Sequence, residues 1–264
     1  MTGPVSDQPT GSSNAAHATE TDSPGVPRAL TGDIGALARA LSGIERGRAD
    51  ALEVLRVARE RGRRARRVVV TGPPGVGKST LLRALVAAIR ARGECAAIIA
   101  CDPSSPQTGG AFLGDRVRWS SHAEDTGVLV RSVAQRGDRA RAGYVVDGMA
   151  DVLDAAGWTW ILVETVGAGQ NEEVGASHAT TLLVLSPACG DEMQMLKAGV
   201  IETADVFAVN RMDLPGAKRW AASLEETLAI SRAVPPPVVR LDAMTGDGVD
   251  RLLAELDAAT GEAR

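Results

Sequence analysis

Residues 67–79 read Arg67-Val68-Val69-Val70-Thr71 and then Gly-Pro-Pro-Gly-Val-Gly-Lys-Ser, directly before a helical pattern. An apolar run, a glycine-rich turn and a helix in this order are the context in which a P-loop motif acquires its meaning. The glycines let backbone N–H groups close around phosphates, and the N-terminus of the helix points a positive dipole end at the anion. The segment therefore predicts a strand-to-helix turn that binds a nucleoside triphosphate.

Two side chains of this turn are predicted to act on the phosphates. The Lys78 ammonium group is expected to reach the β- and γ-phosphates, and the Ser79 hydroxyl is expected to ligate Mg²⁺. The predicted phosphate-binding residues are Gly72, Gly75, Val76, Gly77, Lys78, Ser79 and Thr80.

Length and composition indicate one large α/β domain with an extension, since the chain has 264 residues. Hydrophobic residues make up 44% and aromatic residues 3%, so the core must consist mainly of Ala, Val, Leu and Ile. A net charge of -4 gives no support for a nucleic-acid or membrane-surface partner. Cys95, Cys101 and Cys189 show no paired spacing, which is typical of the reducing cytoplasm.

Three regions are expected along the chain. Residues 1–27 are rich in Ser, Thr, Gly, Pro and Asp, and they have neither the basic start nor the apolar stretch of a secretory signal or a membrane span. We expect a disordered tail there, because such a composition buries too little surface to order itself. A helical extension over 28–65 and a P-loop domain over 66–264 are expected to follow.

The extension is predicted to contain two amphipathic helices. The first is expected to bury one face, and the second is expected to begin near Asp50, where Asp50 and Glu53 suggest a capping box. The residues of the first buried face are Ile34, Leu37, Leu41 and Ile44. A basic run from Arg61 to Arg67 follows, which favours a solvated helix C-terminus over the alternative of a nucleic-acid patch.

Short apolar runs alternate with helical segments through the rest of the chain. The runs are 68–70, 96–101, 128–130, 159–163, 181–185, 206–209 and 238–241. Continuous apolar strands separated by helices indicate a mostly parallel sheet covered by helices on both faces. Ligands of such sheets bind at the carboxyl ends of the strands.

Acidic residues follow two of these runs and supply candidate metal ligands. Asp102 directly follows the run 96–101, Asp115 stands in the segment after it, and Glu164 directly follows the run 159–163. An acid at the carboxyl end of a strand, across from a P-loop, is suited to hold Mg²⁺ together with Ser79. Lys78, Asp102 and Glu164 are the predicted catalytic residues, and Gln170 is the candidate for positioning the attacking water.

A base-recognition site is predicted after the two last strands. Asn210-Arg211-Met212-Asp213 resembles the guanine-reading Asn-Lys-x-Asp motif, in which the aspartate accepts hydrogen bonds that adenine cannot offer. Asn210 is expected to brace the loop, and Arg211 replaces the usual lysine. A second base loop is predicted at Asp242-Ala243-Met244, where the Ala243 backbone meets the guanine oxygen. These residues favour GTP over ATP.

Three further segments resemble the switches of the MeaB/ArgK family, the GTPase chaperones of adenosylcobalamin-dependent acyl-CoA mutases. The first segment spans 102–115 and the second spans 164–170. The third reads Cys189-Gly190-Asp191-Glu192-Met193-Gln194-Met195-Leu196-Lys197-Ala198-Gly199. The likeness covers about residues 29 to 260, and its motifs stand in the family's order.

This resemblance implies a GTPase that binds a mutase such as methylmalonyl-CoA mutase, gates delivery or removal of its cobalamin and protects it from inactivation. It also implies that Asp102, Asp115 and Glu164 form a metal-responsive centre and that Gln194 and Lys197 relay the nucleotide state. A cobalamin adenosyltransferase is a further candidate partner. We expect weak hydrolysis of GTP by the chain alone and faster hydrolysis when the partner orders the switches.

Two other functions stay open at this point. A GTPase that inserts nickel or zinc would need thiolate or imidazole ligands, whereas His17, His122 and His178 are scattered along the chain. A P-loop kinase or ATPase acting on a small molecule is the second alternative, and it would leave the motif at 210–213 unexplained.

Overall fold

A computed structural model describes residues 27–62, 64–102, 125–134, 139–165, 179–188 and 200–262 of the chain. Residues 1–26 of the predicted tail, Asp115, Gln170 and the segment with Gln194 and Lys197 lie outside the described residues.

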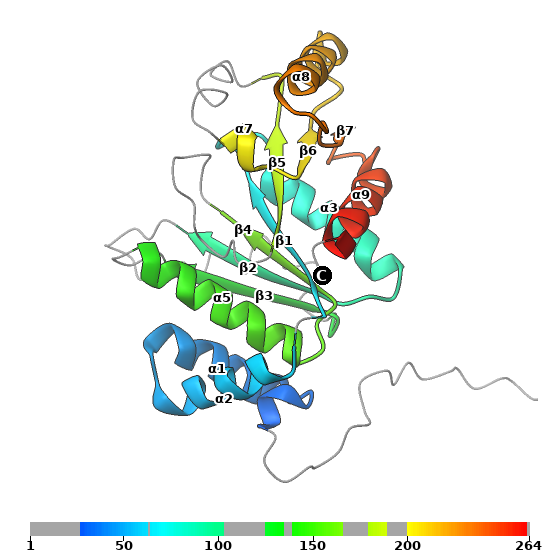
Figure 1. The fold of residues 1–264 in the computed structure, drawn as a ribbon. Coiled ribbons are helices and arrows are strands. Elements are labelled where there is room, and N and C mark those ends of the chain that lie inside the picture. The colour runs from blue at the N-terminus through cyan, green and yellow to red at the C-terminus, as the bar shows by residue number, and fades with distance from the viewer. Residues whose placement is uncertain are drawn as a thin grey trace, which may run out of the picture.

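The centre of the structure is a seven-stranded sheet in the order β3-β2-β4-β1-β5-β6-β7, and all of its pairings are parallel. The strands are β1 (Arg66–Thr71), β2 (Ala96–Asp102), β3 (Val128–Ala134), β4 (Trp160–Glu164), β5 (Thr180–Leu185), β6 (Val206–Val209) and β7 (Val238–Arg240). Each apolar run of the sequence contributes one strand, so the predicted fold class is confirmed (Figure 1).

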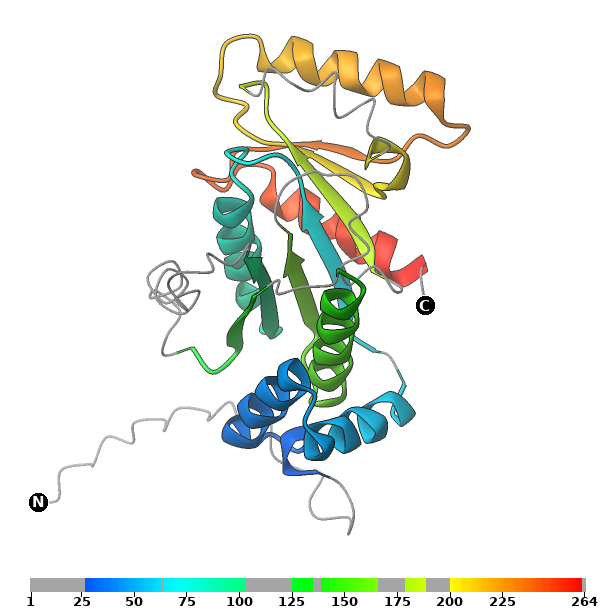
Figure 2. The same ribbon diagram turned by 90° about the vertical axis from the view of Figure 1, so that its left-hand side faces the viewer.

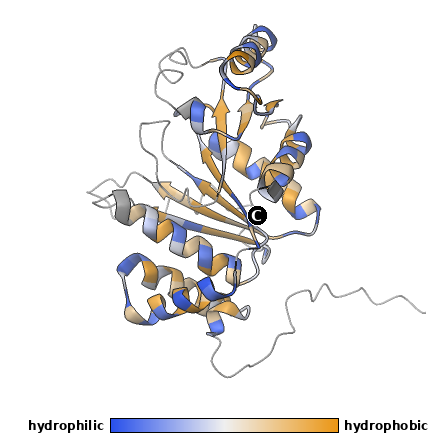
Figure 3. Cartoon of the chain, viewed as in Figure 1, coloured by the Kyte–Doolittle hydropathy of each residue, from blue (hydrophilic) through white to orange (hydrophobic). Residues whose placement is uncertain are grey.

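Helices cover both faces of this sheet. The helices of the described residues are the 3-10 helix η1 (Arg28–Leu30) and the α-helices α1 (Ile34–Arg46), α2 (Ala49–Glu60), α3 (Lys78–Ala91), α5 (Arg139–Ala155), α7 (Val200–Thr203), α8 (Ala217–Ser231) and α9 (Val249–Glu262). The strands are almost entirely hydrophobic, whereas the helices alternate between hydrophobic and hydrophilic residues (Figure 3). This difference is expected when strands are buried on both faces and helices on only one.

Alternating strand residues divide the core between the two faces. Val68 and Val70 of β1 point towards α3 and α9, and Val69 points towards α5. On the side of α5, Leu183 of β5 and Phe207 of β6 pack against α8. Helix α8 and the pair α1–α2 therefore lie at opposite ends of the sheet (Figure 2).

The helical extension packs on α5 as a pair of helices, α1 and α2. Leu37, Leu41 and Ile44 are buried as expected, but Ile34 is 52% exposed. Ile34 is the first residue of α1, so the buried face starts one turn later, at Leu37.

The predicted capping box of the second helix is wrong. Helix α2 begins at Ala49 and its N-cap residue, Arg48, makes no side-chain capping hydrogen bond. Asp50 accepts instead from Arg48, with Nε and Nη2 at 3.0 and 2.8 Å, and Glu53 pairs with Arg56. The helix starts two residues earlier than a cap at Asp50 would give, which puts Asp50 inside the first turn.

A solvated role for the basic run is also wrong at its end, because Arg67 is buried. Its guanidinium group donates to Asp151 Oδ1 at 2.8 Å and to Asp154 Oδ2 at 3.0 Å, and both acids belong to α5. Asp154 also accepts from the backbone N–H groups of Arg64 and Ala65. These contacts bind the segment between α2 and β1 to helix α5.

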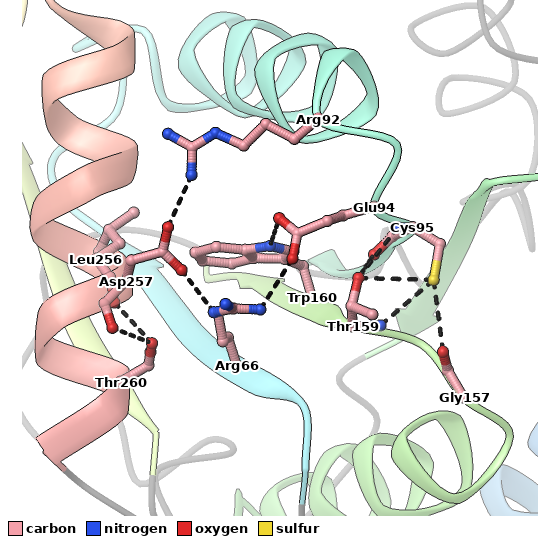
Figure 4. A network of polar contacts seen from close by, with 10 residues as sticks. All are labelled: Arg66, Arg92, Glu94, Cys95, Gly157, Thr159, Trp160, Leu256, Asp257 and Thr260. Carbon is pink, nitrogen blue, oxygen red and sulfur yellow. Dashed lines mark hydrogen bonds and ion pairs between the residues drawn. The ribbon is translucent and has the colours of Figure 1, made fainter.

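Arg66 joins a second network at the amino edge of the sheet (Figure 4). It pairs with Glu94 at 3.0 Å and with Asp257 of α9 at 2.6 Å. Its guanidinium carbon lies 5.1 Å from the ring centroid of Trp160, whose indole N–H donates to Glu94. These contacts fix α9 to the start of β1 and β4.

Within the described residues, none of the helices combines the length and apolar character that crossing a bilayer requires.

Candidate nucleotide-binding site

The candidate site lies where β1, β4, β6 and β7 end. Strand β1 lies between β4 and β5. Strands β2, β3 and β4 lie on one side of β1, and strands β5, β6 and β7 lie on the other, so the strand order reverses at β1. The crevice at such a reversal of strand order is where open parallel sheets bind ligands. The loop 72–77 follows β1 at this position and leads into α3.

Two glycines of this loop are required by close approaches. A Cβ atom on Gly72 would lie 2.2 Å from the carbonyl oxygen of Val184 in β5. Gly77 is the N-cap residue of α3 in the left-handed conformation, with φ at 96°, and a Cβ there would lie 2.5 Å from Asn210 Nδ2. Side chains at either position would displace the backbone that is predicted to cradle the phosphates.

Lys78 begins α3, and its side chain turns back over the loop. The ammonium Nζ donates to the carbonyl oxygens of Gly72 at 2.7 Å and of Pro73 at 2.9 Å. These bonds hold the Lys78 ammonium group inside the loop, and from this position it would bind phosphate oxygens.

Ser79 of helix α3 and Glu164, the last residue of β4, lie in contact. The Ser79 hydroxyl donates to Glu164 Oε1 at 2.6 Å, and both residues are half-buried. A hydroxyl and a carboxylate in contact form the kind of oxygen donor set that Mg²⁺ prefers, so these residues fit the predicted metal ligands. The backbone of Asp102 ends β2, the neighbour of β4, at the same edge of the sheet.

Thr165 was missed by the sequence analysis, although it fixes Glu164 in place. Its backbone N–H donates to the carbonyl of Val70 in β1 at 3.1 Å, and the residue is 2% exposed. The signal available in the sequence was its position: Thr165 directly follows Glu164, the acid that closes the apolar run of β4.

Asn210 connects three loops of the site. Its Nδ2 donates to the Val76 carbonyl at 2.8 Å, and its Oδ1 accepts from the backbone N–H of Ala243 at 3.0 Å. Its own backbone N–H donates to the carbonyl of Leu185 at the end of β5. The phosphate loop and both predicted base loops are therefore held at one place by a side chain that is 3% exposed.

The remaining predicted base-binding residues surround this bracket. Arg211 has a φ of 63° and is exposed, as is Asp213. Asp242 Oδ1 accepts from the backbone N–H of Met244 at 2.8 Å, which fixes the second loop and leaves Met244 82% exposed. A left-handed non-glycine residue is uncommon and is concentrated at functional sites.

Comparison with known proteins identifies the family of the chain. A family model described as methylmalonyl-CoA mutase-associated GTPase MeaB matches residues 37–261. A putative GTPase of Pyrococcus horikoshii is 38% identical over 234 residues, which cover 86% of this chain and 74% of the relative. The mitochondrial methylmalonic aciduria type A homolog of mouse is 32% identical over 194 residues, 70% of this chain and 47% of that protein. GTPase ArgK of Escherichia coli is 38% identical over 56% of this chain and 45% of its own length.

Solved structures share the fold. One described as LAO/AO transport system kinase has a TM-score of 0.70 at 24% identity and covers 90% of this chain and 75% of its own. HypB from Helicobacter pylori in complex with nickel has a TM-score of 0.55 at 15% identity and covers 80% of this chain and 93% of its own. At these identities the likeness concerns the fold alone. The family model, in contrast, spans most of the sequence, and the chain therefore belongs to the MeaB family of methylmalonyl-CoA mutase-associated GTPases.

Proposed function

We propose that this GTPase is a chaperone of an adenosylcobalamin-dependent acyl-CoA mutase, which gates the loading or removal of cobalamin and protects the mutase from inactivation. The observation that carries the proposal is the match of residues 37–261 to a family described by its association with methylmalonyl-CoA mutase. A cobalamin adenosyltransferase is a further candidate partner. The buried cysteines Cys95 and Cys101 are thiols, which supports a cytoplasmic location.

The phosphate loop supplies the binding of GTP in this proposal. Backbone N–H groups of residues 72–77 and the N-terminus of α3 receive the phosphates, and Lys78 exchanges its bonds to the carbonyls of Gly72 and Pro73 for phosphate oxygens. The Asp213 carboxylate accepts from the guanine ring N–H and amino group, while Arg211 and Met244 flank the base.

Ser79, Glu164 and Asp102 are the residues that would hold Mg²⁺, with Asp115 as a further candidate. The cation, when bound, neutralises charge that develops on the phosphate oxygens. Ser79 and Glu164 already place two oxygens side by side for it. Gln170 remains our candidate for orienting the attacking water. Slow hydrolysis by the chain alone follows if the partner has to order the loops that carry these residues.

GTP and ATP hydrolysis by the purified chain, with and without a panel of cobalamin-dependent acyl-CoA mutases, tests the proposal. We expect turnover selective for GTP that one mutase raises and that Lys78→Ala abolishes. Equal use of ATP together with a phosphorylated metabolite would instead favour a small-molecule kinase. Stimulation by a nickel or zinc enzyme precursor, and by no mutase, would favour metal insertion.

A further inference from the structure

Arg59 of α2 and Tyr144 of α5 form a stacked pair at the surface of the helical layer. The guanidinium carbon of Arg59 lies 5.4 Å from the centroid of the Tyr144 ring. Tyr144 is 50% exposed, whereas the aromatic residues Phe207, Trp158 and Trp160 are buried. Tyrosine and arginine are among the residue types that contribute most to binding at protein–protein interfaces. The pair therefore has the composition of an interface anchor.

A buried carboxylate holds this pair in place. Arg59 Nε donates to Asp151 Oδ2 at 2.9 Å, and the Asp151 side chain is 4% exposed and also accepts from Arg67. An arginine that is free in solution loses side-chain freedom when a partner captures it, and this loss weakens binding. Arg59 is already ordered by Asp151 and by the Tyr144 ring, so its capture by a partner costs less entropy.

The Arg59 guanidinium group can still receive a ligand. Its side chain is 45% exposed, and the bond to Asp151 uses Nε and not the two terminal nitrogens. The terminal nitrogens of an arginine are suited to bind a carboxylate. Leu52 lies seven positions before Arg59, hence on the same side of α2, and it is also exposed. We call the surface of Leu52, Arg59 and Tyr144 the α2–α5 face.

The helices around this face carry an excess of positive charge. Residues 28–67 contain eleven arginines and five acidic residues, although the whole chain has a net charge of -4. Arg46 and Arg64 are exposed in addition to Arg59. Opposite charge steers a partner towards such a surface, so its complement is acidic. A nucleic acid is disfavoured, because the negatively charged remainder of the chain would repel it.

We infer that the α2–α5 face binds an acidic protein surface, with a carboxylate of the partner on the Arg59 guanidinium group and the Tyr144 ring covered by the contact. The inference rests on the proposed function, in which the partner is an acyl-CoA mutase, and adds the surface through which the mutase is held. Helix α5 begins shortly after β3 ends, so its first turns, with Tyr144, lie towards the edge of the sheet that carries the nucleotide site. A partner on this face can therefore also reach the loops of that site.

Titration of the full chain with the mutase of the panel that raises its GTP hydrolysis, with GDP present throughout, tests the inference through affinity. For Tyr144→Ser and for Arg59→Gln we expect the affinity to fall by about tenfold or more. Added NaCl should weaken binding of the unaltered chain more than binding of Arg59→Gln, which has lost one attracting charge. GTP hydrolysis by each variant alone should match that of the unaltered chain.

Two further variants separate this contact from general effects. Arg219→Gln removes an exposed arginine from α8, at the other end of the sheet, and should bind the mutase as the unaltered chain does (Figure 2). Arg59→Lys keeps the charge but lacks the planar fork, so its affinity should lie between those of the unaltered chain and of Arg59→Gln. Thermal melting checks folding. Tyr144→Ser leaves both bonds of Asp151 intact, so it tests the inference even if Arg59→Gln does not fold.

A folded Tyr144→Ser protein that binds the mutase as tightly as the unaltered chain would overturn the inference and leave the proposed chaperone intact. If no mutase of the panel binds the unaltered chain, the proposed function and the inference both fail, and the two failures are thereby distinguished. Tight binding of duplex DNA that Arg59→Gln abolishes would also overturn the inference, because the face would then be a nucleic-acid surface.

Discussion

Asn210 is the residue on which the assembly of the site depends most, because one buried amide bridges Val76 and Ala243. Asn210→Ala leaves both backbone groups without their partner, and each such loss costs about 1–3 kcal/mol. We expect the free energy of unfolding to fall by about 2–4 kcal/mol and GDP affinity to fall with it, measured by urea denaturation and by titration. Asn210→Asp keeps the acceptor for the Ala243 N–H and loses the donor to Val76, so its stability and GDP affinity should lie between those of the unaltered chain and of Asn210→Ala. An Asn210→Ala protein of unchanged stability would contradict this role.

Two glycines of the phosphate loop offer a matched pair for testing the close approach of Asn210. Both Gly75 and Gly77 have positive φ, at 82° and 96°, but a Cβ on Gly75 meets nothing within 4 Å. Gly75→Ala should therefore lose only the cost of placing an alanine in the left-handed conformation, which is about 1–2 kcal/mol of unfolding free energy. Gly77→Ala should lose more stability in urea denaturation and most of its GDP affinity, since its Cβ displaces the amide of Asn210. Equal losses would show that the contact is unimportant.

At the scale of elements, the link between α2 and β1 depends on the buried ion network of Arg67. Arg67→Met leaves Asp151 and Asp154 buried without this cation, and breaking a buried pair in this way costs about 3–5 kcal/mol. We expect that loss in urea denaturation of the full chain. Arg56→Met is the control, because Arg56 forms exposed pairs with Glu53 and Glu60 whose removal should change little. Similar stabilities of the two variants would contradict the network's importance.

The start of α1 predicts a dependence of stability on pH. Asp33 is the N-cap residue, and the hydrogen bond from the Ala36 backbone N–H, followed by the charges of Arg28 and Arg39, holds the pKa of its carboxyl below the usual value. A lowered pKa in the folded state stabilises the fold above the ordinary pKa of about 3.9, and this contribution is lost as pH falls through the lower value. Asp33→Asn cannot titrate, so its unfolding free energy should fall less between about pH 6 and pH 3. Parallel pH profiles of the two proteins would refute this assignment.

The strands and the phosphate loop were predictable because their signals are local. Each strand is a continuous apolar run, and the loop is a contiguous motif with a strand before it and a helix after it. The order of the strands was not predictable in this way, since it depends on which runs pair at long range. The role of Arg67 was missed for the same reason: its partners, Asp151 and Asp154, lie more than eighty positions away.

At the scale of the whole molecule, the site collects loops from distant parts of the chain at one edge of the sheet. Contact between Ser79 and Glu164 joins residues 85 positions apart, and Asn210 reaches Val76 across 134 positions. The sequence suggested each partner separately, from its type and its place after a strand. Their mutual distances, and the bracing by Thr165, come only from the folded sheet.

The proposed chaperone requires that nucleotide state and partner binding influence each other. Because coupling between binding free energies is reciprocal, a mutase whose binding is gated by the nucleotide state must bind the GTP-loaded and GDP-loaded chain with different affinity. The most direct measurement is the affinity of methylmalonyl-CoA mutase for the full chain loaded with GDP and with a non-hydrolysable GTP analogue. We predict affinities that differ by about fivefold or more. Equal affinities in the two states, or no complex with any cobalamin-dependent acyl-CoA mutase, would contradict the account.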